Sequence, residues 1–149
     1  MSYTYNYPRP AVTVDCLIFR RFASGWHILL IQRDKPPFEG AWAFPGGFVD
    51  IDEPLLAAAE RELEEETGLG GTDLEQFRTF GQPGRDPRGR TISVVYYGFI
   101  DAAHDTPRAG SDARNARWFK INDLPRLAFD HSRIIEMALD RLDFPGQKG

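Results

Sequence analysis

Residues 47–69 read GFVDIDEPLLAAAERELEEETGL, and they are the most informative part of the sequence. It begins with turn-forming and acidic residues and continues into a run of leucine and alanine, which favour helix. Pro54 suits the first position of a helix, and Gly68 is typical of the position just after a helix ends. The pattern predicts a helix over residues 54–67, and five of the seven residues in 60–66 are glutamates.

An acidic run on a helix is most often a solvated face. The spacing of these glutamates indicates more, because at 100° per residue Glu62, Glu65 and Glu66 lie within an arc of about 100°. That arc adjoins the stripe expected to be buried, which consists of Leu56, Ala59 and Leu63. Glu60 and Glu64 point away from it and are expected to be ordinary surface charges.

The glutamates also crowd the last turn of the helix, where the helix dipole is negative. Carboxylates there are disfavoured by about 0.3–1 kcal/mol each, and Glu62 and Glu66 repel one another. A bound divalent cation would offset this field, and carboxylate oxygens suit Mg²⁺ or Mn²⁺. A zinc site is not indicated, because His27, His104 and His131 are scattered along the chain and each suits a surface or core position.

The rest of the chain predicts one α/β domain, residues 1–149, in which helices cover a mixed sheet. Apolar and β-branched runs predict strands, and the spacing of apolar residues near the end predicts a second helix. The Pro/Gly-rich residues 35–47 are expected to be mostly loop, and residues 1–10 a possible N-terminal arm. The predicted strands are 11–19, 26–31, 74–80, 91–100 and 116–121, and the predicted second helix is 130–142.

Composition excludes several classes of protein. The net charge is −4, so a nucleic-acid partner and an anionic membrane surface are not expected. No segment is apolar and long enough for a membrane span or signal peptide. The single cysteine, Cys16, lies in an apolar run, which indicates a buried thiol and a reducing cytoplasm.

Every defining position of one known motif is filled in this stretch. Gly47, Glu53, Arg61-Glu62-Leu63, Glu65-Glu66 and Gly68-Leu69 together resemble the Nudix box. The resemblance implies an α/β/α sandwich that hydrolyses a nucleoside diphosphate linked to another moiety. It also implies that the metal ligands are Glu62, Glu65 and Glu66, with the carbonyl of Gly46 as a further one, and that Glu53 pairs with Arg61.

Two candidates emerge for the group that takes the proton from the attacking water. One is Glu66 itself. The other is an acid in the loop before Trp118, where the Nudix family often carries a further carboxylate. Asp112 is the best-placed acid of this loop, with Asp105 second, although a solvated loop acid is an equal alternative for Asp112.

The segments outside the box resemble the ADP-ribose pyrophosphatase branch of the Nudix family. They are RPAVTVD, PFEGAWAFPGGFV, LEQFRTFGQPGRDPRGRTISVVYY and LAFDH, and the branch includes domains of NAD-metabolism regulators and of bifunctional nicotinamide-nucleotide adenylyltransferases. The resemblance implies cleavage of ADP-ribose to AMP and ribose 5-phosphate by a homodimer. Alternatives are hydrolysis of another nucleotide and a sensor that binds ADP-ribose without turnover. Only seven residues follow Leu142, so we expect no DNA-binding domain.

Three arginines in six residues, Arg85, Arg88 and Arg90, are candidates for clamping a diphosphate. A solvated turn with Asp86 as the local partner is the alternative. Phe44 is a candidate substrate contact. Stacking on adenine is open to several other aromatic residues, namely Phe38, Trp42, Phe80, Tyr3, Tyr5 and Tyr7.

Overall fold

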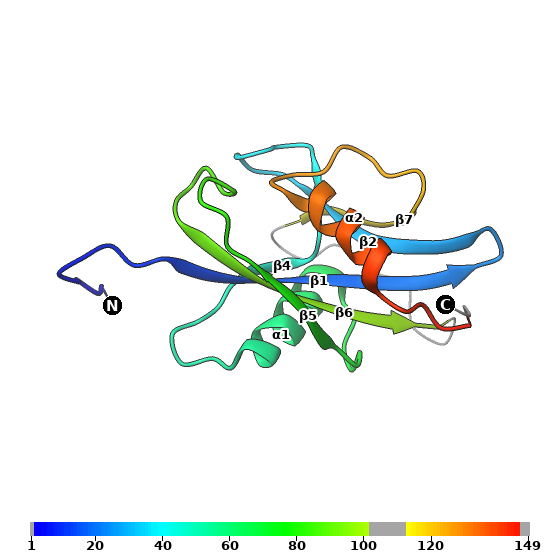
Figure 1. Ribbon diagram of the computed structural model, residues 1–149, viewed down its shortest axis with the longest axis horizontal. Helices are drawn as coiled ribbons and strands as arrows, with labels where there is room; N and C mark the ends of the chain where they lie inside the picture. The colour runs from blue at the N-terminus through cyan, green and yellow to red at the C-terminus, as the bar shows by residue number, and fades with distance from the viewer. Residues whose placement is uncertain (1, 102–112, 147–149) are drawn as a thin grey trace.

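A computed structural model describes residues 2–101 and 113–146 (Figure 1). The elements in chain order are β1 (Ala11–Phe22), β2 (Gly25–Arg33), β3 (Trp42–Ala43), β4 (Gly46–Phe48), α1 (Leu55–Thr67), β5 (Glu75–Phe80), β6 (Thr91–Ile100), β7 (Ala113–Lys120) and α2 (His131–Arg141). Every strand and helix expected from the sequence is present, with boundaries shifted by at most a few residues.

The strands form one mixed sheet with the order β3-β2-β1-β6-β5. β1 and β6 run parallel over ten residue pairs, and the other pairings are antiparallel. β2 also pairs with β7, and the short β4 pairs with the first half of β1. Asp15 of β1 lies opposite Gly46 of β4, so the start of the Nudix-like stretch is fixed to the centre of the sheet.

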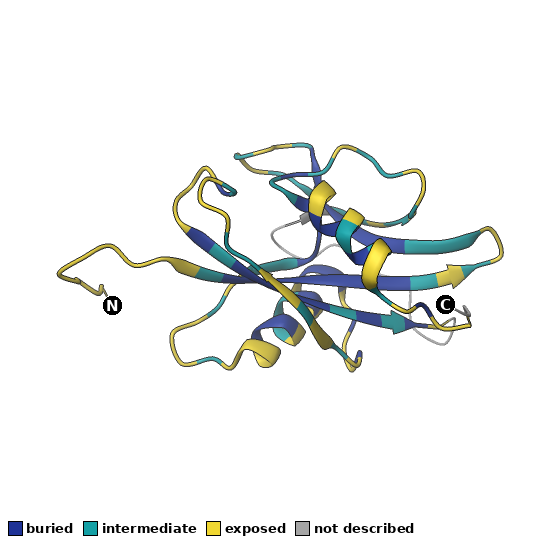
Figure 2. Cartoon of the chain, viewed as in Figure 1, coloured by how far each residue is buried: buried dark blue, intermediate teal, exposed yellow. Residues whose placement is uncertain are grey.

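The two helices cover opposite faces of this sheet (Figure 1). Side chains alternate along β1 because successive residues of a strand point to opposite faces. Cys16 and Ile18 pack with Leu63 of α1 in one core cluster, whereas Leu17 and Phe19 pack in the other cluster with the buried side of α2. Burial is concentrated in β1, β2 and β6 and on the inner sides of both helices (Figure 2). The predicted α/β/α sandwich is confirmed.

The 35–47 stretch is mostly loop, as expected, but it also contains β3 and the start of β4. Strands of two and three residues are too short to show an alternation of apolar and polar residues. They form because β4 pairs with β1 and β3 pairs with β2. The helix begins one residue later than predicted, since Pro54 is extended and only precedes the first turn. Leu56 was wrongly placed in the buried stripe: it is 44% exposed in that first turn, which is exposed to solvent (Figure 2).

The N-terminal residues form an arm that extends away from the sheet (Figure 1). Tyr3, Tyr5 and Tyr7 are exposed, the rings of Tyr3 and Tyr5 stack, and the guanidinium of Arg9 lies 3.7 Å from the centre of the Tyr5 ring. Cys16 is buried and reduced, as expected. Within the residues that the structure describes, no helix has the length and apolar character needed to cross a membrane.

Candidate active site

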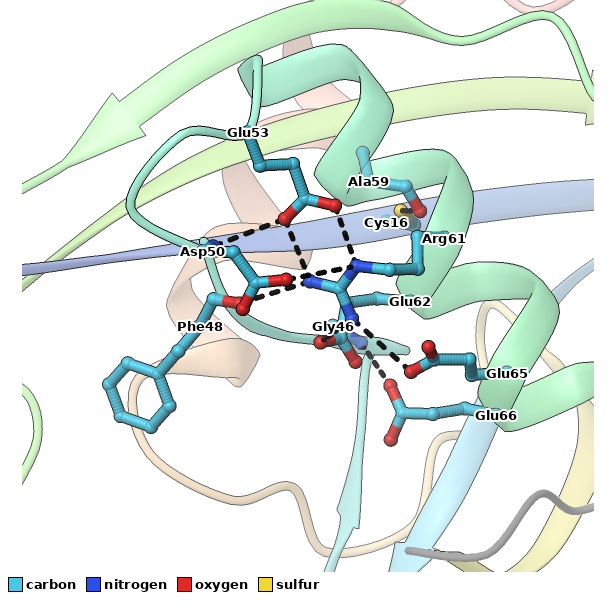
Figure 3. Close-up of polar contacts among 10 residues, drawn as sticks. All are labelled: Cys16, Gly46, Phe48, Asp50, Glu53, Ala59, Arg61, Glu62, Glu65 and Glu66. Carbon is cyan, nitrogen blue, oxygen red and sulfur yellow. Dashed lines mark hydrogen bonds and ion pairs between the residues drawn. The ribbon is translucent and has the colours of Figure 1, made fainter. Parts of the chain in front are cut away.

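Arg61 is the centre of the charged contacts around α1 (Figure 3). Its guanidinium donates to both carboxylate oxygens of Glu53, at 2.6 and 2.9 Å, and to the carbonyl of Phe48 at 3.2 Å. The hydrogen bonds with Arg61 hold the pKa of Glu53 below its usual value, and they raise the pKa of Arg61. The pairing of Glu53 with Arg61 expected from the Nudix resemblance is therefore present, and it ties the loop before α1 to the helix.

The same guanidinium also reaches the glutamates at the end of α1. It donates to Glu62 at 2.9 Å and to Glu65 at 3.2 Å. The last turn of α1 contains no basic residue. Arg61, one turn earlier in the helix, offsets part of the repulsion among these carboxylates.

Two glycines of β4 let the glutamates approach the sheet closely. The backbone N–H of Gly46 donates to Glu66 at 2.6 Å (Figure 3). A Cβ atom on Gly47 would lie 2.6 Å from the carboxylate carbon of Glu62, so any larger residue would displace that side chain. Glu66 is buried and Glu65 largely exposed, whereas Glu60 and Glu64 are exposed as predicted.

The donor set suits a hard divalent cation, since it consists of carboxylate oxygens with a backbone carbonyl nearby. The glycine backbone leaves room that a side chain would fill. Among residues 2–101 and 113–146, no three acidic, histidine or cysteine side chains are already gathered around one point. Metal binding would therefore require Glu62 and Glu65 to turn away from Arg61, and the chemistry of the site fits such an ion.

Two adjoining pockets lie beside these glutamates. The more open one has a volume of about 380 Å³ and includes Arg61, Glu62 and Glu66 in its walls. The narrower one, of about 100 Å³, reaches to the α2 face of the sheet. The two share a set of lining residues, which are Ile31, Arg33, Gly46, Gly47, Phe48, Glu66 and Arg88. They therefore form one continuous site, which an extended molecule with two chemically different ends would fit.

The three arginines of the predicted clamp differ in their surroundings: Arg85 and Arg88 both line the narrow pocket, whereas Arg90 does not. The side chain of Arg85 is mostly covered, lines the narrow pocket and forms a bidentate pair with Asp130, at 2.7 and 2.9 Å. Arg90 is exposed, donates to the carbonyl of Gly81 and lines neither pocket. Arg88 lines both pockets, although its partner is Asp86, as in the alternative considered above. Burial opposes ionisation of Asp86, and Arg88 outweighs it, so the pKa of Asp86 is lowered.

A second arginine, which the sequence did not single out, joins Arg88 in the site. The guanidiniums of Arg33 and Arg88 lie 5.0 and 5.2 Å from the centre of the Phe129 ring. Burial and the charge of Arg88 lower the pKa of Arg33. Phe129 has a φ of 52°, an uncommon conformation for a residue with a Cβ atom, and it lies next to the pocket. Two like charges held together beside an aromatic ring favour an anionic ligand.

Two buried polar residues, Asp15 and His131, line the narrow pocket and are 8% and 3% exposed. Burial raises the pKa of Asp15 to about 6, against the opposing hydrogen bond from Ser93. Burial lowers the pKa of His131 to about 3, so its ring is neutral at ordinary pH. Phe44, a predicted substrate contact, lines the pocket but stacks on His131 with ring centres 4.3 Å apart.

Sequence reasoning gave neither Asp15 nor His131 a role in the site. A signal existed for Asp15, because it is an acid within an otherwise apolar strand, AVTVDCLIF. His131 follows LAFD at the start of α2, and its place beside β1 depends on the tertiary fold. Asp112 and Asp105, the predicted alternatives for the proton acceptor, lie outside the described residues.

Comparisons with known proteins agree with this geometry. The ADP-ribose pyrophosphatase of Methanocaldococcus jannaschii is 43% identical over 130 residues, which cover 87% of this chain and 73% of that protein. The ADPR responsive transcriptional repressor NtrR of Acinetobacter baylyi is 38% identical over 93% of this chain, and the match spans 56% of the repressor.

Among solved structures, the NUDIX domain of Shewanella oneidensis NrtR complexed with ADP ribose superposes with a TM-score of 0.85. It is 32% identical, and the match covers 92% of this chain and 91% of that one. The sequence profile of the NUDIX domain matches residues 9–138. With the complete glutamate motif placed on α1 beside the pocket, this chain belongs to the NUDIX domain family.

Proposed function

We propose that this Nudix hydrolase cleaves the diphosphate of ADP-ribose to AMP and ribose 5-phosphate in a metal-dependent reaction. One observation carries the choice of substrate: the relative that is 43% identical over most of the chain is an ADP-ribose pyrophosphatase. The Shewanella domain solved with ADP ribose supports the same ligand. The pocket agrees in its chemistry, because Glu66 and the arginines Arg33 and Arg88 line the same continuous site.

Glu62, Glu65, Glu66 and the carbonyl of Gly46 would hold the ion, Mg²⁺ or Mn²⁺. Once bound, such an ion neutralises the diphosphate and lowers the pKa of a bound water. Arg61 would keep its bidentate contact with Glu53, which ties the loop before α1 to the helix, while Glu62 and Glu65 bind the ion.

The remaining steps belong to side chains around the ion. Arg88, between the two pockets, would bind the diphosphate oxygens and orient them. Glu66, held by the Gly46 N–H at the pocket wall, or Asp112 would take the proton from the attacking water. Arg85 would hold Asp130 and the start of α2 in place at the wall of the narrow pocket, whereas Arg90 lines neither pocket.

The test is the release of AMP from ADP-ribose by the full chain with Mg²⁺, for the wild type and for Glu66→Gln. Loss of turnover with retained ADP-ribose binding would support the assignment. Turnover that Glu66→Gln leaves unchanged, while ADP-ribose still binds, would show that the metal-site assignment is wrong.

A sensor that binds ADP-ribose without turnover is the second candidate, favoured by the likeness to NtrR and NrtR. Tight binding of ADP-ribose by a wild-type chain that releases no AMP would establish it. A cytoplasmic location, a homodimer and the absence of a nucleic-acid partner stay predictions. Light scattering on the purified chain measures the oligomeric state directly.

A further inference from the structure

In the wall of the narrow pocket, Asp15 and His131 present one hydrogen-bond acceptor and one donor side by side. Oδ1 of Asp15 lies 3.9 Å from Nε2 of His131, which is too far for a direct hydrogen bond. Oδ2 of Asp15 is already engaged by the hydroxyl of Ser93. Within the described part of the chain, neither Oδ1 of Asp15 nor Nε2 of His131 has a hydrogen-bond partner, and both residues line the pocket.

The backbone fixes which nitrogen of His131 carries the proton. The N–H of Phe44 points at Nδ1 of His131, with 3.2 Å between the two nitrogens, so Nδ1 is an acceptor. In a neutral imidazole the other nitrogen is then the donor. The Phe44 ring stacks on the imidazole and holds its orientation. Nε2–H of His131 therefore faces the Asp15 carboxylate across a fixed gap.

The gap between Asp15 and His131 suits a hydroxyl group. An oxygen atom can lie about 2.8 Å from each of two atoms that are 3.9 Å apart, so one ligand oxygen can reach both. A hydroxyl donates one hydrogen bond and accepts another, which satisfies the acceptor and the donor together. A phosphate oxygen can only accept, and the ionised Asp15 would repel it. The diphosphate is therefore directed to the arginine and glutamate side.

A single residue, Gly46, lies between the Asp15–His131 pair and Glu66. Its N–H binds Glu66, and a Cβ atom on it would lie 2.6 Å from Oδ1 of Asp15. A ligand that spans both places must carry a hydroxyl only a few bonds away from its phosphate. A ribose attached to the diphosphate has this arrangement, and the pocket volume of about 100 Å³ admits one sugar rather than a whole dinucleotide.

We propose that Asp15 and His131 form a ribose-recognition pair, in which a sugar hydroxyl of the substrate donates to Asp15 and accepts from His131. The proposal rests on the proposed ADP-ribose hydrolysis and assigns the two residues that select the sugar. A site built to satisfy a hydroxyl rejects an analogue that lacks it, because its buried polar groups then remain unpaired.

The experiment measures kcat/KM for AMP release from ADP-ribose and from analogues that each lack one hydroxyl of either ribose. The enzymes are the wild type, Asp15→Asn and His131→Asn. Asparagine at position 131 keeps an acceptor near the Nδ1 position for the Phe44 N–H and removes the Nε2–H group. We expect each variant to lower kcat/KM on ADP-ribose by about 10- to 100-fold.

One analogue should behave differently from the rest. Wild-type kcat/KM should fall by a similar factor on the analogue that lacks the recognised hydroxyl, and Asp15→Asn should cause little further loss there. Its identity shows which of the two riboses is bound. An equal loss for Asp15→Asn on every substrate would overturn the proposal and indicate a structural role only. The proposal would also be overturned if the loss of kcat/KM caused by Asp15→Asn disappeared only on inosine diphosphate ribose. In that case Asp15 would bind the edge of the adenine base and not a ribose hydroxyl.

Two controls separate the possible failures. Asp140→Asn changes an exposed aspartate of α2 outside the site and should leave kcat/KM unchanged on every substrate. His131→Gln places an amide donor near the position of Nε2 and should recover part of the activity lost in His131→Asn. A wild type that hydrolyses ADP-ribose but shows no analogue-specific coupling overturns the ribose assignment alone. A wild type that releases no AMP overturns the proposed function instead.

Discussion

Replacing Asp15 by asparagine should make the protein more stable at neutral pH while it weakens the site. Asp15 is buried beneath the pocket, and desolvation of its carboxylate raises its pKa from 3.8 to about 6. The folded state therefore binds this proton more tightly than the unfolded state does. Above pH 6 the carboxylate is ionised in both states, and the folded state alone bears the cost of keeping a charge out of water.

The size of the effect follows from the shift in the pKa of Asp15. A change from 3.8 to about 6 corresponds to about 3 kcal/mol, at 1.36 kcal/mol for each pKa unit. Asparagine has nearly the same shape and can still pair with Ser93, but carries no charge. Asp15→Asn should thus raise the free energy of unfolding by up to about 3 kcal/mol at pH 8, or about 6–12 °C in Tm.

The pH dependence distinguishes this cause from a change in packing. As pH falls from 6 toward 4, the wild type recovers the lost stability because Asp15 takes up its proton in the folded state. Urea unfolding of both proteins in EDTA, at pH 8 and pH 4, measures the difference. We expect most of the gain at pH 8 to be absent at pH 4. A variant less stable than the wild type at pH 8, or an equal gain at both pH values, would show that the buried charge of Asp15 does not destabilise the fold.

Three further predictions follow from the site. Glu66→Gln should lower AMP release by at least about 100-fold, whereas Glu60→Gln, on the exposed side of α1, should leave it unchanged; similar rates for the two would contradict the assignment. Gly46→Ala brings a Cβ atom 2.1 Å from a backbone carbonyl of β1 and should cost about 1–3 kcal/mol in urea unfolding. The Cβ atom of Gly47→Ala meets only the flexible carboxylate of Glu62, so this variant should lose more activity than stability. A Gly47→Ala variant that loses stability but keeps its activity would contradict this expectation. Burial lowers the pKa of His131 to about 3, so the protein loses stability as pH falls below about 6.5. His131→Asn should therefore make the free energy of unfolding, measured in urea, depend less on pH between about 6.5 and 3.

The glutamate helix could be predicted from sequence because its signals are local. Leucine and alanine content, Pro54 and Gly68 define α1 within a residue, and Gly68 has the positive φ of 80° that a helix end favours. The spacing of the Nudix box also gave the Glu53–Arg61 contact. These features depend on residues fewer than 25 positions apart, which one helix and its preceding loop bring together.

The Asp15–His131 part of the pocket could not be predicted, because it depends on contacts between distant segments. Asp15 and His131 are brought together by β1 and α2, which lie at opposite ends of the chain. Arg85 illustrates the same limit, since its nearness in sequence to Arg88 and Arg90 indicated a shared ligand. Its actual partner is Asp130, 45 residues away. Loop residues acquire partners from the tertiary fold, and no local period indicates which partners these are.

The rate of AMP release from ADP-ribose is the decisive measurement of the proposed activity. The full chain would be incubated with Mg²⁺ or with EDTA, beside an oxidised nucleoside triphosphate, a dinucleoside polyphosphate and NADH as competing substrates. This account predicts that ADP-ribose has the highest kcat/KM, that AMP and ribose 5-phosphate form in equal amounts, and that EDTA abolishes the reaction until Mg²⁺ or Mn²⁺ is restored. ADP-ribose hydrolysed no faster than the other compounds, or at the same rate in EDTA, would contradict it.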